Sequence, residues 1–412
     1  MKILLMTWAC DMEDVSEPEI CSKWVREIAK DHDVTLFAVS RPDRYGCVKE
    51  QFPDLNVIEW KDIWVPKGLE KFRSVAKPGY IPYYFKARRF LRRLFKHQDF
   101  DVVHQITPLA WRYPSPAAGL GVPFIRGPIE GGLDTPTPLK SAVAGNLPFY
   151  YKLRDFDKFR KSIDPILKQS FLQTEMLLLA APYVEEVIQP LKFQSSVLES
   201  DHGLLDKQRH PYNDKKLQNN PDCVTFVYVG RIVRTKGLRD AIHGLAAAKM
   251  RQKAKLIVIG DGDDLEICKQ QAKDLNIENL VDFKGWQTRD EVDHFYQSSD
   301  VFLFPSFREP TGGVFLEAMS HSLATISCKY GGPEYFIDDE CGILIPPQAP
   351  DQYAKAIGAA IDRLIADPTL RASMSKAAWK RANTHFSWEE KRKRLAHLYS
   401  QLSDNTHKPE VT

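Results

Sequence analysis

Apolar and polar positions alternate along the chain in a pattern that predicts short buried strands separated by amphipathic helices. The apolar run from Ile3 to Met6 predicts a first strand. The stretch Ser16-Glu17-Pro18-Glu19 is typical of a capping box, and it precedes apolar residues at helical spacing: Ile20, Trp24, Val25 and Ile28. Further strands are expected at "DVTLFAVS", at "FDVVHQI" and at "VPFI", the last leading into a turn, "RGPIEGG". This alternation predicts a parallel, doubly wound sheet with helices on both faces.

A second series of strands and helices follows a polar, irregular segment at residues 206–223. Its strands are expected at "VTFVYVG", "AKLIVIGDG", "NLVDFKGW", "DVFLFPS", "ATISC" and "CGILIPP". We therefore expect an α/β protein with two Rossmann-like domains, residues 1–205 and 206–387. Ligands of such sheets bind at the carboxyl ends of the strands, which here would face a central cleft between the domains.

Composition and charge narrow the class of protein. With 412 residues, of which 43% are hydrophobic and 27% charged, the chain is long enough for two cores. A net charge of +3 argues against nucleic-acid binding. The seven cysteines are scattered and never form a C-x-x-C pair, which argues for a reducing compartment and against disulfides or a zinc site. The first apolar run reads as a strand, not a signal peptide, and no run approaches the roughly 20 residues of a membrane span. We expect a soluble, cytoplasmic protein.

Candidate chemistry gathers at three strand ends of the second half, each of which carries glycine. Arg231 and Lys236 follow the first of these strands, Gly260 and Gly262 follow the next, and a helix is expected to start at Gly313. Glycine allows backbone N–H groups to approach a ligand, and a helix start carries about half a positive charge. Together with the two cations, this arrangement predicts a site that binds a diphosphate and stabilises it as a leaving group without a metal.

Two carboxylates flank this helix start. Glu309 precedes the helix, where it can contact polar groups of a substrate, and Glu317 lies within the first turns. A carboxylate beside a phosphate site is tolerable when it accepts hydrogen bonds from a vicinal diol such as ribose. The pattern indicates a nucleoside diphosphate that carries a sugar.

At this point the sequence resembles family 4 glycosyltransferases, which are retaining enzymes of GT-B fold. Glu309, seven intervening residues and Glu317 form the E-x₇-E signature of that family. The likeness extends to "GRIVRTKG", "GDG", "DVFLFPS" and "YGGPEYFIDDECGILIPP", and to the terminal "FSWEEKRKRLAHLY". In such proteins that last segment, here about 388–402, is a helix that returns to the N-terminal domain. The likeness is strong over residues 222–400 and looser before them, where "DVVHQI" and "PFIRGPIEGG" resemble the acceptor-side strands.

The resemblance implies roles for individual residues. Arg231 and Lys236 would hold the diphosphate, Glu317 the ribose, and Glu309 the transferred sugar near its reacting carbon. The remaining expected donor contacts are Gly312, Gly313, Thr311, Gly260, Gly262 and, against the nucleobase, Trp286. No metal or cofactor is implied, and we expect UDP in preference to GDP as the nucleotide.

The N-terminal half departs from the family pattern. The loop "TWACDMEDVSEPE" lacks the glycine pair that many relatives place after the first strand, and "RGPIEGG" stands where relatives often carry a histidine. That histidine's role would be vacant or would fall to Arg126, Glu130 or the backbone of Gly131-Gly132, and no catalytic base is assigned. His104 either faces the cleft or is a hydrogen-bonded structural residue.

The segment Tyr84 to His97 combines an apolar stripe with an entirely basic face. One interpretation is a Rossmann helix with a solvated basic side. The other is a helix that docks on anionic lipid and presents a lipid-linked acceptor to the cleft. The protein would then be peripheral on the inner face of the membrane.

The sequence as a whole predicts a retaining glycosyltransferase. It would move a sugar, expected to be a hexose, from a nucleoside-diphosphate sugar to an acceptor hydroxyl in polysaccharide, glycolipid or glycoconjugate biosynthesis. The acceptor would be a sugar, a lipid-linked group or a small molecule. Two alternatives stay open from sequence: a sugar-nucleotide epimerase of the same fold, and a non-catalytic nucleotide-sugar-binding protein.

Overall fold

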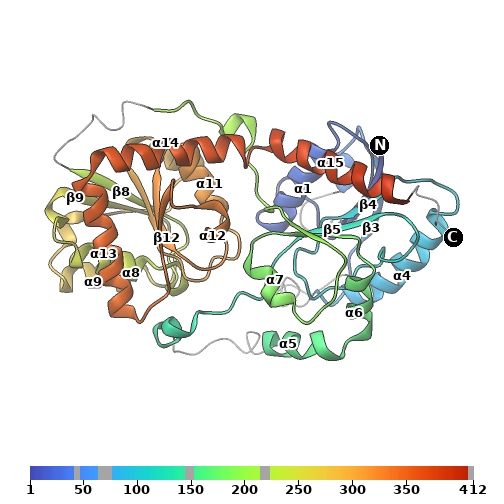
Figure 1. The fold of residues 1–412 in the computed structure, drawn as a ribbon, viewed down its shortest axis with the longest axis horizontal. Helices are drawn as coiled ribbons and strands as arrows, with labels where there is room; N and C mark the ends of the chain where they lie inside the picture. The colour runs from blue at the N-terminus through green and yellow to red at the C-terminus, as the bar shows by residue number, and fades with distance from the viewer. Residues whose placement is uncertain (41–46, 64–76, 144–152, 214–222, 407–412) are drawn as a thin grey trace.

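Two parallel sheets, each covered by helices, form the two halves of the molecule (Figure 1). The computed structural model describes residues 1–40, 47–63, 77–143, 153–213 and 223–406. The first sheet has the strand order β3-β2-β1-β4-β5-β6-β7, and the second has the order β10-β9-β8-β11-β12-β13. Every strand pair in both sheets is parallel. The predicted doubly wound α/β architecture is therefore confirmed.

The N-terminal sheet comprises β1 (Lys2–Thr7), β2 (Asp33–Ser40), β3 (Asn56–Lys61), β4 (Val102–Gln105), β5 (Phe124–Ile129), β6 (Met176–Leu179) and β7 (Ser196–Leu198). Its helices are α1 (Glu17–Ile28), α2 (Val48–Gln51), α4 (Tyr80–Leu94), α5 (Leu153–Ile163), α6 (Pro165–Leu172) and α7 (Tyr183–Ile188), with a 3₁₀ turn η1 (Thr137–Val143). The expected domain boundary at residue 206 lies between β7 and the next strand, at the 3₁₀ turn η3 (Asp206–Gln208).

The C-terminal sheet comprises β8 (Val224–Val229), β9 (Ala254–Ile259), β10 (Val281–Gly285), β11 (Val301–Phe304), β12 (Ala324–Cys328) and β13 (Gly342–Ile345). Its helices are α8 (Leu238–Ala247), α9 (Leu265–Asp274), α10 (Arg289–Ser298), α11 (Gly313–Ser320), α12 (Pro333–Phe336), α13 (Pro350–Ala366) and α14 (Pro368–Thr384), with short 3₁₀ turns η5 (Arg234–Lys236), η6 (Arg251–Lys253) and η7 (Glu278–Leu280). All six strands expected from sequence are present.

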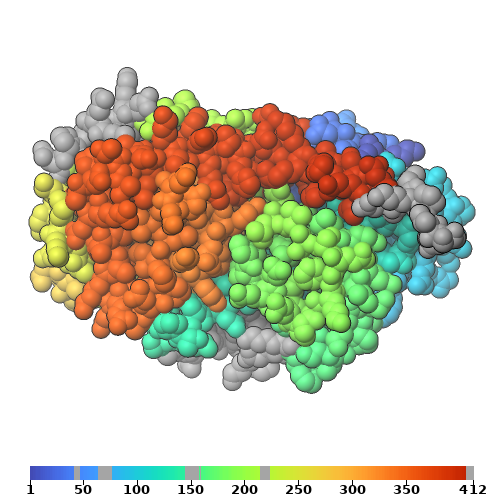
Figure 2. Space-filling model, in the orientation of Figure 1, coloured from blue at the N-terminus to red at the C-terminus, as the bar shows by residue number. Residues whose placement is uncertain are grey.

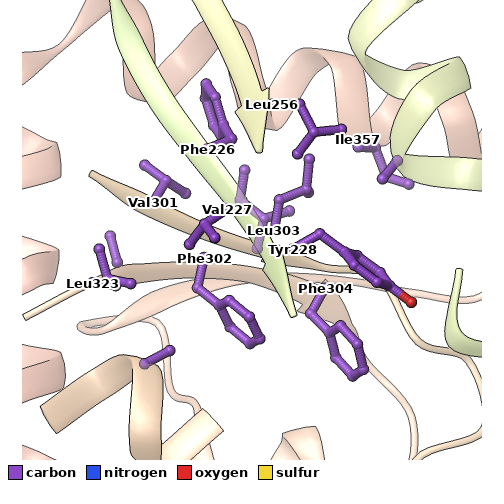
Figure 3. Close-up of a cluster of buried hydrophobic side chains, with 14 of the residues drawn as sticks. Phe226, Val227, Tyr228, Leu256, Val301, Phe302, Leu303, Phe304, Leu323 and Ile357 are labelled. Carbon is purple, nitrogen blue, oxygen red and sulfur yellow. The ribbon is translucent and has the colours of Figure 1, made fainter. Parts of the chain in front are cut away.

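The central strands β8 and β11 are buried on both faces, which explains their unbroken apolar runs. Figure 3 shows Phe226 and Tyr228 of β8 among Phe302 and Phe304 of β11, with Leu256 of β9 beside them. All five side chains are at most 1% exposed. This core holds the ends of three strands in place, and the loops that follow them form the candidate site.

Two local predictions in the N-terminal domain are wrong. Helix α1 forms and buries Trp24 and its apolar neighbours, but Ser16 has a φ of 66° and its side chain makes no cap hydrogen bond. Glu17 instead accepts a hydrogen bond from the backbone N–H of Leu109 at 3.0 Å. The segment read as the turn "RGPIEGG" is strand up to Ile129, because β5 continues through Arg126.

The chain crosses twice between the domains, and the two crossings lie side by side. Leu204 pairs with Ser387 in an isolated parallel bridge, and the N–H of Trp388 donates to the carbonyl of Leu204 at 3.0 Å. Helix α15 (Trp388–Thr406) then packs against α1 and β4 of the N-terminal domain. Helices α14 and α15 run in succession across both domains along one edge of the molecule (Figure 1), and the red atoms of this part of the chain form a band along the same edge in Figure 2. The second crossing thus ties the two sheets together.

A buried lysine joins α15 to the first crossing. Lys391 is fully buried, its Nζ donates to the carbonyls of Ser200 and His202, and it lies 3.6 Å from a carboxylate oxygen of Glu199. Burial lowers the pKa of Lys391 to about 8. Arg394 makes a two-point contact with the same Glu199 at 2.9 and 3.0 Å. The charged groups at this joint are therefore paired.

Within the described residues, no helix is both long enough and apolar enough to cross a membrane.

Candidate active site

Glycines at the ends of β8 and β9 allow the two following loops to touch backbone to backbone. Gly260 has a φ of +135°, and a Cβ there would collide with the carbonyl oxygen of Gly230. Gly262 has a φ of +154°, and a Cβ there would collide with the carbonyl oxygen of Ile232. The N–H of Ile232 also donates to the carbonyl of Asp261 at 2.8 Å. These glycines therefore hold the loops in a close-packed frame beside the site.

The centre of the site is a close ion pair between the loops after β8 and β11. Lys236, at the end of η5, places its Nζ 2.5 Å from Oε2 of Glu309, and the two side chains are 16% and 10% exposed. The ammonium also lies 5.8 Å from the ring centre of Phe304. Residues 73 positions apart in the sequence are thus joined at the carboxyl ends of adjacent strands.

The loop after β12 supports this pair through backbone contacts with the loop that carries Glu309. The N–H of Gly332 donates to the carbonyl of Glu309 at 2.8 Å. A Cβ at Gly332 would collide with the backbone of Thr311, which is itself only 7% exposed. Glu309 and Thr311 are therefore held by backbone contacts, and the expected donor contact Thr311 lies within that support.

Helix α11 begins at Gly313, as expected, with Gly312 at its N-cap in the left-handed region at a φ of 101°. The ring of His202 packs directly over this helix start, because a Cβ on Gly313 would lie 2.8–2.9 Å from three of its atoms. His202 belongs to the first interdomain crossing, and its Nε2 lies 3.6 Å from a carboxylate oxygen of Asp201. The N-terminal end of α11 thus meets the other half of the molecule.

Glu317, one turn further along α11, lies at the interdomain surface. Its side chain is 39% exposed, and its nearest cation is Arg289, at 3.5 Å. Burial raises the pKa of Glu317, while the charges of Arg289 and His202 act to lower it. A hollow of about 220 Å³ opens beside it, lined from the N-terminal domain by Glu19 and Lys23 among others. The carboxylate is therefore available to a ligand in the cleft.

Two other expected donor contacts lie at the surface. Arg231 is exposed, and none of the contacts found among the described residues involves its guanidinium. Trp286, in the loop between β10 and α10, is 73% exposed. A bare cation and a bare indole are both suited to bind a ligand, the first a phosphate and the second a flat ring.

On the N-terminal side, His104 and Arg126 do not face the cleft. For His104 this agrees with the structural alternative left open from sequence, and for Arg126 it corrects the expectation of a place on the acceptor side. His104 is completely buried, and its ring nitrogens pair with the Tyr399 hydroxyl and the Gly127 carbonyl, each at 2.7 Å. Burial lowers its pKa to about 4. Arg126 is 1% exposed, donates to the carbonyl of Tyr113 at 2.5 Å, and has its pKa lowered to about 10 by burial. Both are structural residues, because they lie inside strands whose two faces are covered.

Glu130, by contrast, lies just past the end of β5 and is only partly buried. Burial raises its pKa to about 8, and the negative charges of Asp201, Glu17 and Glu309 add to the shift. Since Glu309 belongs to the C-terminal domain, two carboxylates from opposite domains lie close enough to interact. Of the three residues that the sequence suggested for the acceptor side, only Glu130 interacts with the loop that carries Glu309.

Sequence reasoning missed His202 and Arg289. His202 follows β7 in an irregular segment, and nothing in "SDHGLL" connects it with Gly313, more than 100 residues later. Arg289 could have been found, since it opens a helix directly after the strand and turn that carry Trp286.

Comparison with known proteins finds a family match for the C-terminal domain. The family described as "Glycosyl transferases group 1" matches residues 211–381. A lipopolysaccharide core biosynthesis glycosyltransferase of Rhizobium meliloti is 29% identical over 188 residues, which are 45% of this chain and 52% of that protein. The chain spans about half the length of the curated relatives it matches.

Solved structures resemble the whole chain. Sucrose-phosphate synthase from Thermosynechococcus elongatus has a TM-score of 0.64 at 19% identity, covering 98% of this chain and 99% of that one. Anabaena HepE in complex with UDP has a TM-score of 0.62 at 16% identity, covering 97% and 100%. The two-domain arrangement is thus the GT-B fold of these structures, and the expected resemblance to glycosyltransferases is confirmed, with residues 211–381 matching group 1 of the glycosyl transferases.

Proposed function

We propose that this protein transfers a sugar from a nucleoside-diphosphate sugar to an acceptor hydroxyl with retention of anomeric configuration. The observation that carries the proposal is the Lys236–Glu309 pair, which lies beside the start of α11 within the segment that matches group 1 of the glycosyl transferases. Retention of configuration follows from the family resemblance.

Departure of the diphosphate would be stabilised by three positive groups. Lys236 supplies one full charge, the exposed Arg231 a second, and the start of α11 a partial charge. Lys236 is held by Glu309, so the ammonium is already in place. When the donor binds, the ammonium would turn to phosphate and leave the carboxylate free to accept hydrogen bonds from sugar hydroxyls. No metal is needed for this charge balance.

The nucleoside would extend from the diphosphate towards the edge of the C-terminal domain. Glu317 would accept hydrogen bonds from the ribose diol, and the exposed Trp286 would stack on the base. We propose UDP as the nucleotide in preference to GDP, in keeping with the UDP-bound structure of the same fold.

The acceptor would enter from the N-terminal domain, past Glu130 and the Gly131-Gly132 backbone. A lipid-linked acceptor is favoured by helix α4, whose outward side is unusual. Ile81 is 70% and Phe85 58% exposed, while Ala87 is buried. The exposed cations on and after the same helix are Lys86, Arg89, Arg92, Arg93 and Lys96. We propose that this side docks on anionic lipid at the inner face of the membrane, in polysaccharide or glycolipid biosynthesis.

Vesicle co-sedimentation tests the membrane step. Binding should rise with the anionic lipid fraction, and Phe85→Ser with Arg89→Glu should abolish it. Vesicle binding that does not depend on the anionic lipid fraction would contradict the proposed membrane docking.

Calorimetric titration with UDP, GDP and ADP tests the donor site. One diphosphate should bind, and Lys236→Ala and Glu317→Ala should each weaken it, the first through phosphate and the second through ribose. Pyrophosphate, which lacks the nucleoside, separates the two effects, because Glu317→Ala should not alter pyrophosphate binding. Absence of any nucleotide binding by the folded protein would end the enzyme proposal.

A further inference from the structure

Two histidines and an aspartate meet beside the interdomain crossing, away from the Lys236–Glu309 pair. The rings of His210 and His321 stack with centres 3.8 Å apart and an angle of 25° between their planes. Oδ1 of Asp293 lies 3.2 Å from Nε2 of His321. One nitrogen of each histidine and one oxygen of Asp293 all lie within 4.8 Å of one another.

The three residues come from separate elements. His210 follows η3 on the segment that joins the domains, Asp293 lies on α10, and His321 is the C-cap directly after α11. The two histidines are also held by residues outside the cluster: the carbonyl of His210 accepts a hydrogen bond from Nε1 of Trp379 at 2.7 Å, and His321 stacks on Tyr296. The tertiary fold therefore brings the three residues together, because they come from separate elements and the two histidines have contacts outside the cluster.

The cluster opens into a hollow that can hold an ion and its water. This hollow has a volume of about 220 Å³ and is lined by all three residues. His321 is 4% exposed, whereas the carboxylate side chain of Asp293 is 39% exposed. A ligand set that is buried on one side and open on the other leaves a coordination position for solvent.

The donor atoms select the kind of ion. Two imidazoles and one carboxylate suit a first-row transition metal such as Zn²⁺, while Mg²⁺ and Ca²⁺ prefer oxygen ligands alone. On a tetrahedral Zn²⁺ with bonds of about 2.0–2.1 Å, neighbouring ligand atoms lie roughly 3.4 Å apart. Nearly parallel rings can present one nitrogen each to the same side, so modest side-chain rotation brings the three atoms from within 4.8 Å to that spacing.

We propose that His210, Asp293 and His321 form a binding site for Zn²⁺ or a similar divalent transition-metal ion. The bound ion would fasten the interdomain segment to α10 and α11, one turn beyond Glu317. Arg289 and Glu317 line the same hollow, so the site borders the nucleotide region without belonging to the diphosphate cradle. The proposal concerns metal binding and stands whether or not the protein transfers sugar.

The test uses the full-length chain, freed of any affinity tag and stripped of metal with a chelator. Calorimetric titration with Zn²⁺ at neutral pH should show one ion per chain, confirmed by elemental analysis after gel filtration. The Co²⁺-loaded protein should show the visible absorption of a low-coordinate cobalt site. Asp293→Asn keeps the size of the side chain, and we expect it to weaken Zn²⁺ binding by about 100-fold, at least as much as loss of an outer-shell partner does. His210→Ala should weaken it similarly.

Two control variants separate this site from adventitious binding. Asp290→Asn changes a neighbour that lines the same hollow, and His243→Ala removes an exposed histidine on α8. Both should leave Zn²⁺ affinity within about twofold, because neither belongs to the ligand set. Absence of stoichiometric binding, or binding that survives Asp293→Asn and His210→Ala, would overturn the proposal.

Discussion

Replacement of Lys236 by alanine offers the most direct test of the proposed chemistry. At about 4 Å from a unit of phosphate charge, the ammonium would stabilise the departing diphosphate by about 4 kcal/mol at an effective dielectric constant near 20. Part of this is offset, because Lys236 must first release Glu309, a pair at 2.5 Å with side chains 16% and 10% exposed. Such a partly buried pair offsets on the order of 1 kcal/mol.

The remaining 3 kcal/mol or so corresponds to a loss on the order of 10² in rate, and to 10³ if Glu309 contributes less than assumed. The assay is the initial rate of donor turnover, by transfer or by hydrolysis, measured as kcat and as kcat/KM. If the ammonium meets charge that develops during the reaction, kcat should fall and not only the affinity. Lys236→Arg should restore part of the activity.

Lys255→Ala provides a matched control. Lys255 lies in the same domain and is also paired with a carboxylate, Asp282, at 3.2 Å, but its side chain is 47% exposed. Its loss should leave the rate within twofold or so. A Lys236→Ala enzyme with less than fivefold loss in turnover would refute the assignment of Lys236 to the leaving group.

Three further predictions concern the interdomain surface. Gly313→Ala should push the His202 ring away from the start of α11, and so weaken nucleotide binding or loosen the contact between the domains. The double variant with His202→Ala removes the clash and should recover nucleotide affinity in titration. Burial raises the pKa of Glu130 to about 8, so the folded chain holds a proton that the unfolded chain releases near pH 4–5. The Tm should therefore fall as pH rises from about 5 to about 8 and level off above it, and Glu130→Gln should flatten this dependence; an unchanged slope would contradict it. Lys391→Ala should lower the free energy of unfolding by about 3 kcal/mol in denaturant melts, because it breaks a buried ion pair, while Lys393→Ala, 62% exposed on the same helix, should change it by less than about 0.5 kcal/mol.

Local pattern was enough to predict every strand of the C-terminal sheet, and β1, β2, β4 and β5 of the N-terminal sheet. The strand expected at "DVTLFAVS" forms with the same bounds as β2, and α11 begins at the expected Gly313. Strands buried on both faces need continuous apolar runs, and turns between strand and helix need glycine or polar residues, so each element leaves a local signal. The positions of Lys236 and Glu309 after strand ends, and of Glu317 in the helix that follows, came from the same signals.

Local pattern failed where the outcome depended on what covers a strand. From sequence, Arg126 is one candidate for the role of the missing histidine, and His104 is either a cleft residue or a structural one, yet both lie in the core. Gly127-Pro128 read as a turn, but β5 continues through it between β4 and β6. Neither the extension of a strand nor the side it exposes can be known without the neighbouring strands and helices.

Short segments of the sequence were enough to predict the two α/β domains and to single out the residues proposed to bind the donor, because strand periodicity, glycine turns and the spacing of Glu309 and Glu317 are local properties. The tertiary structure alone decided which residues meet across long separations. It brought His202 onto Gly313, placed Glu130 near Glu309, and assembled His210 with Asp293 and His321. These contacts depend on how the interdomain crossings pack, and a crossing's path is set by the surfaces of both domains together.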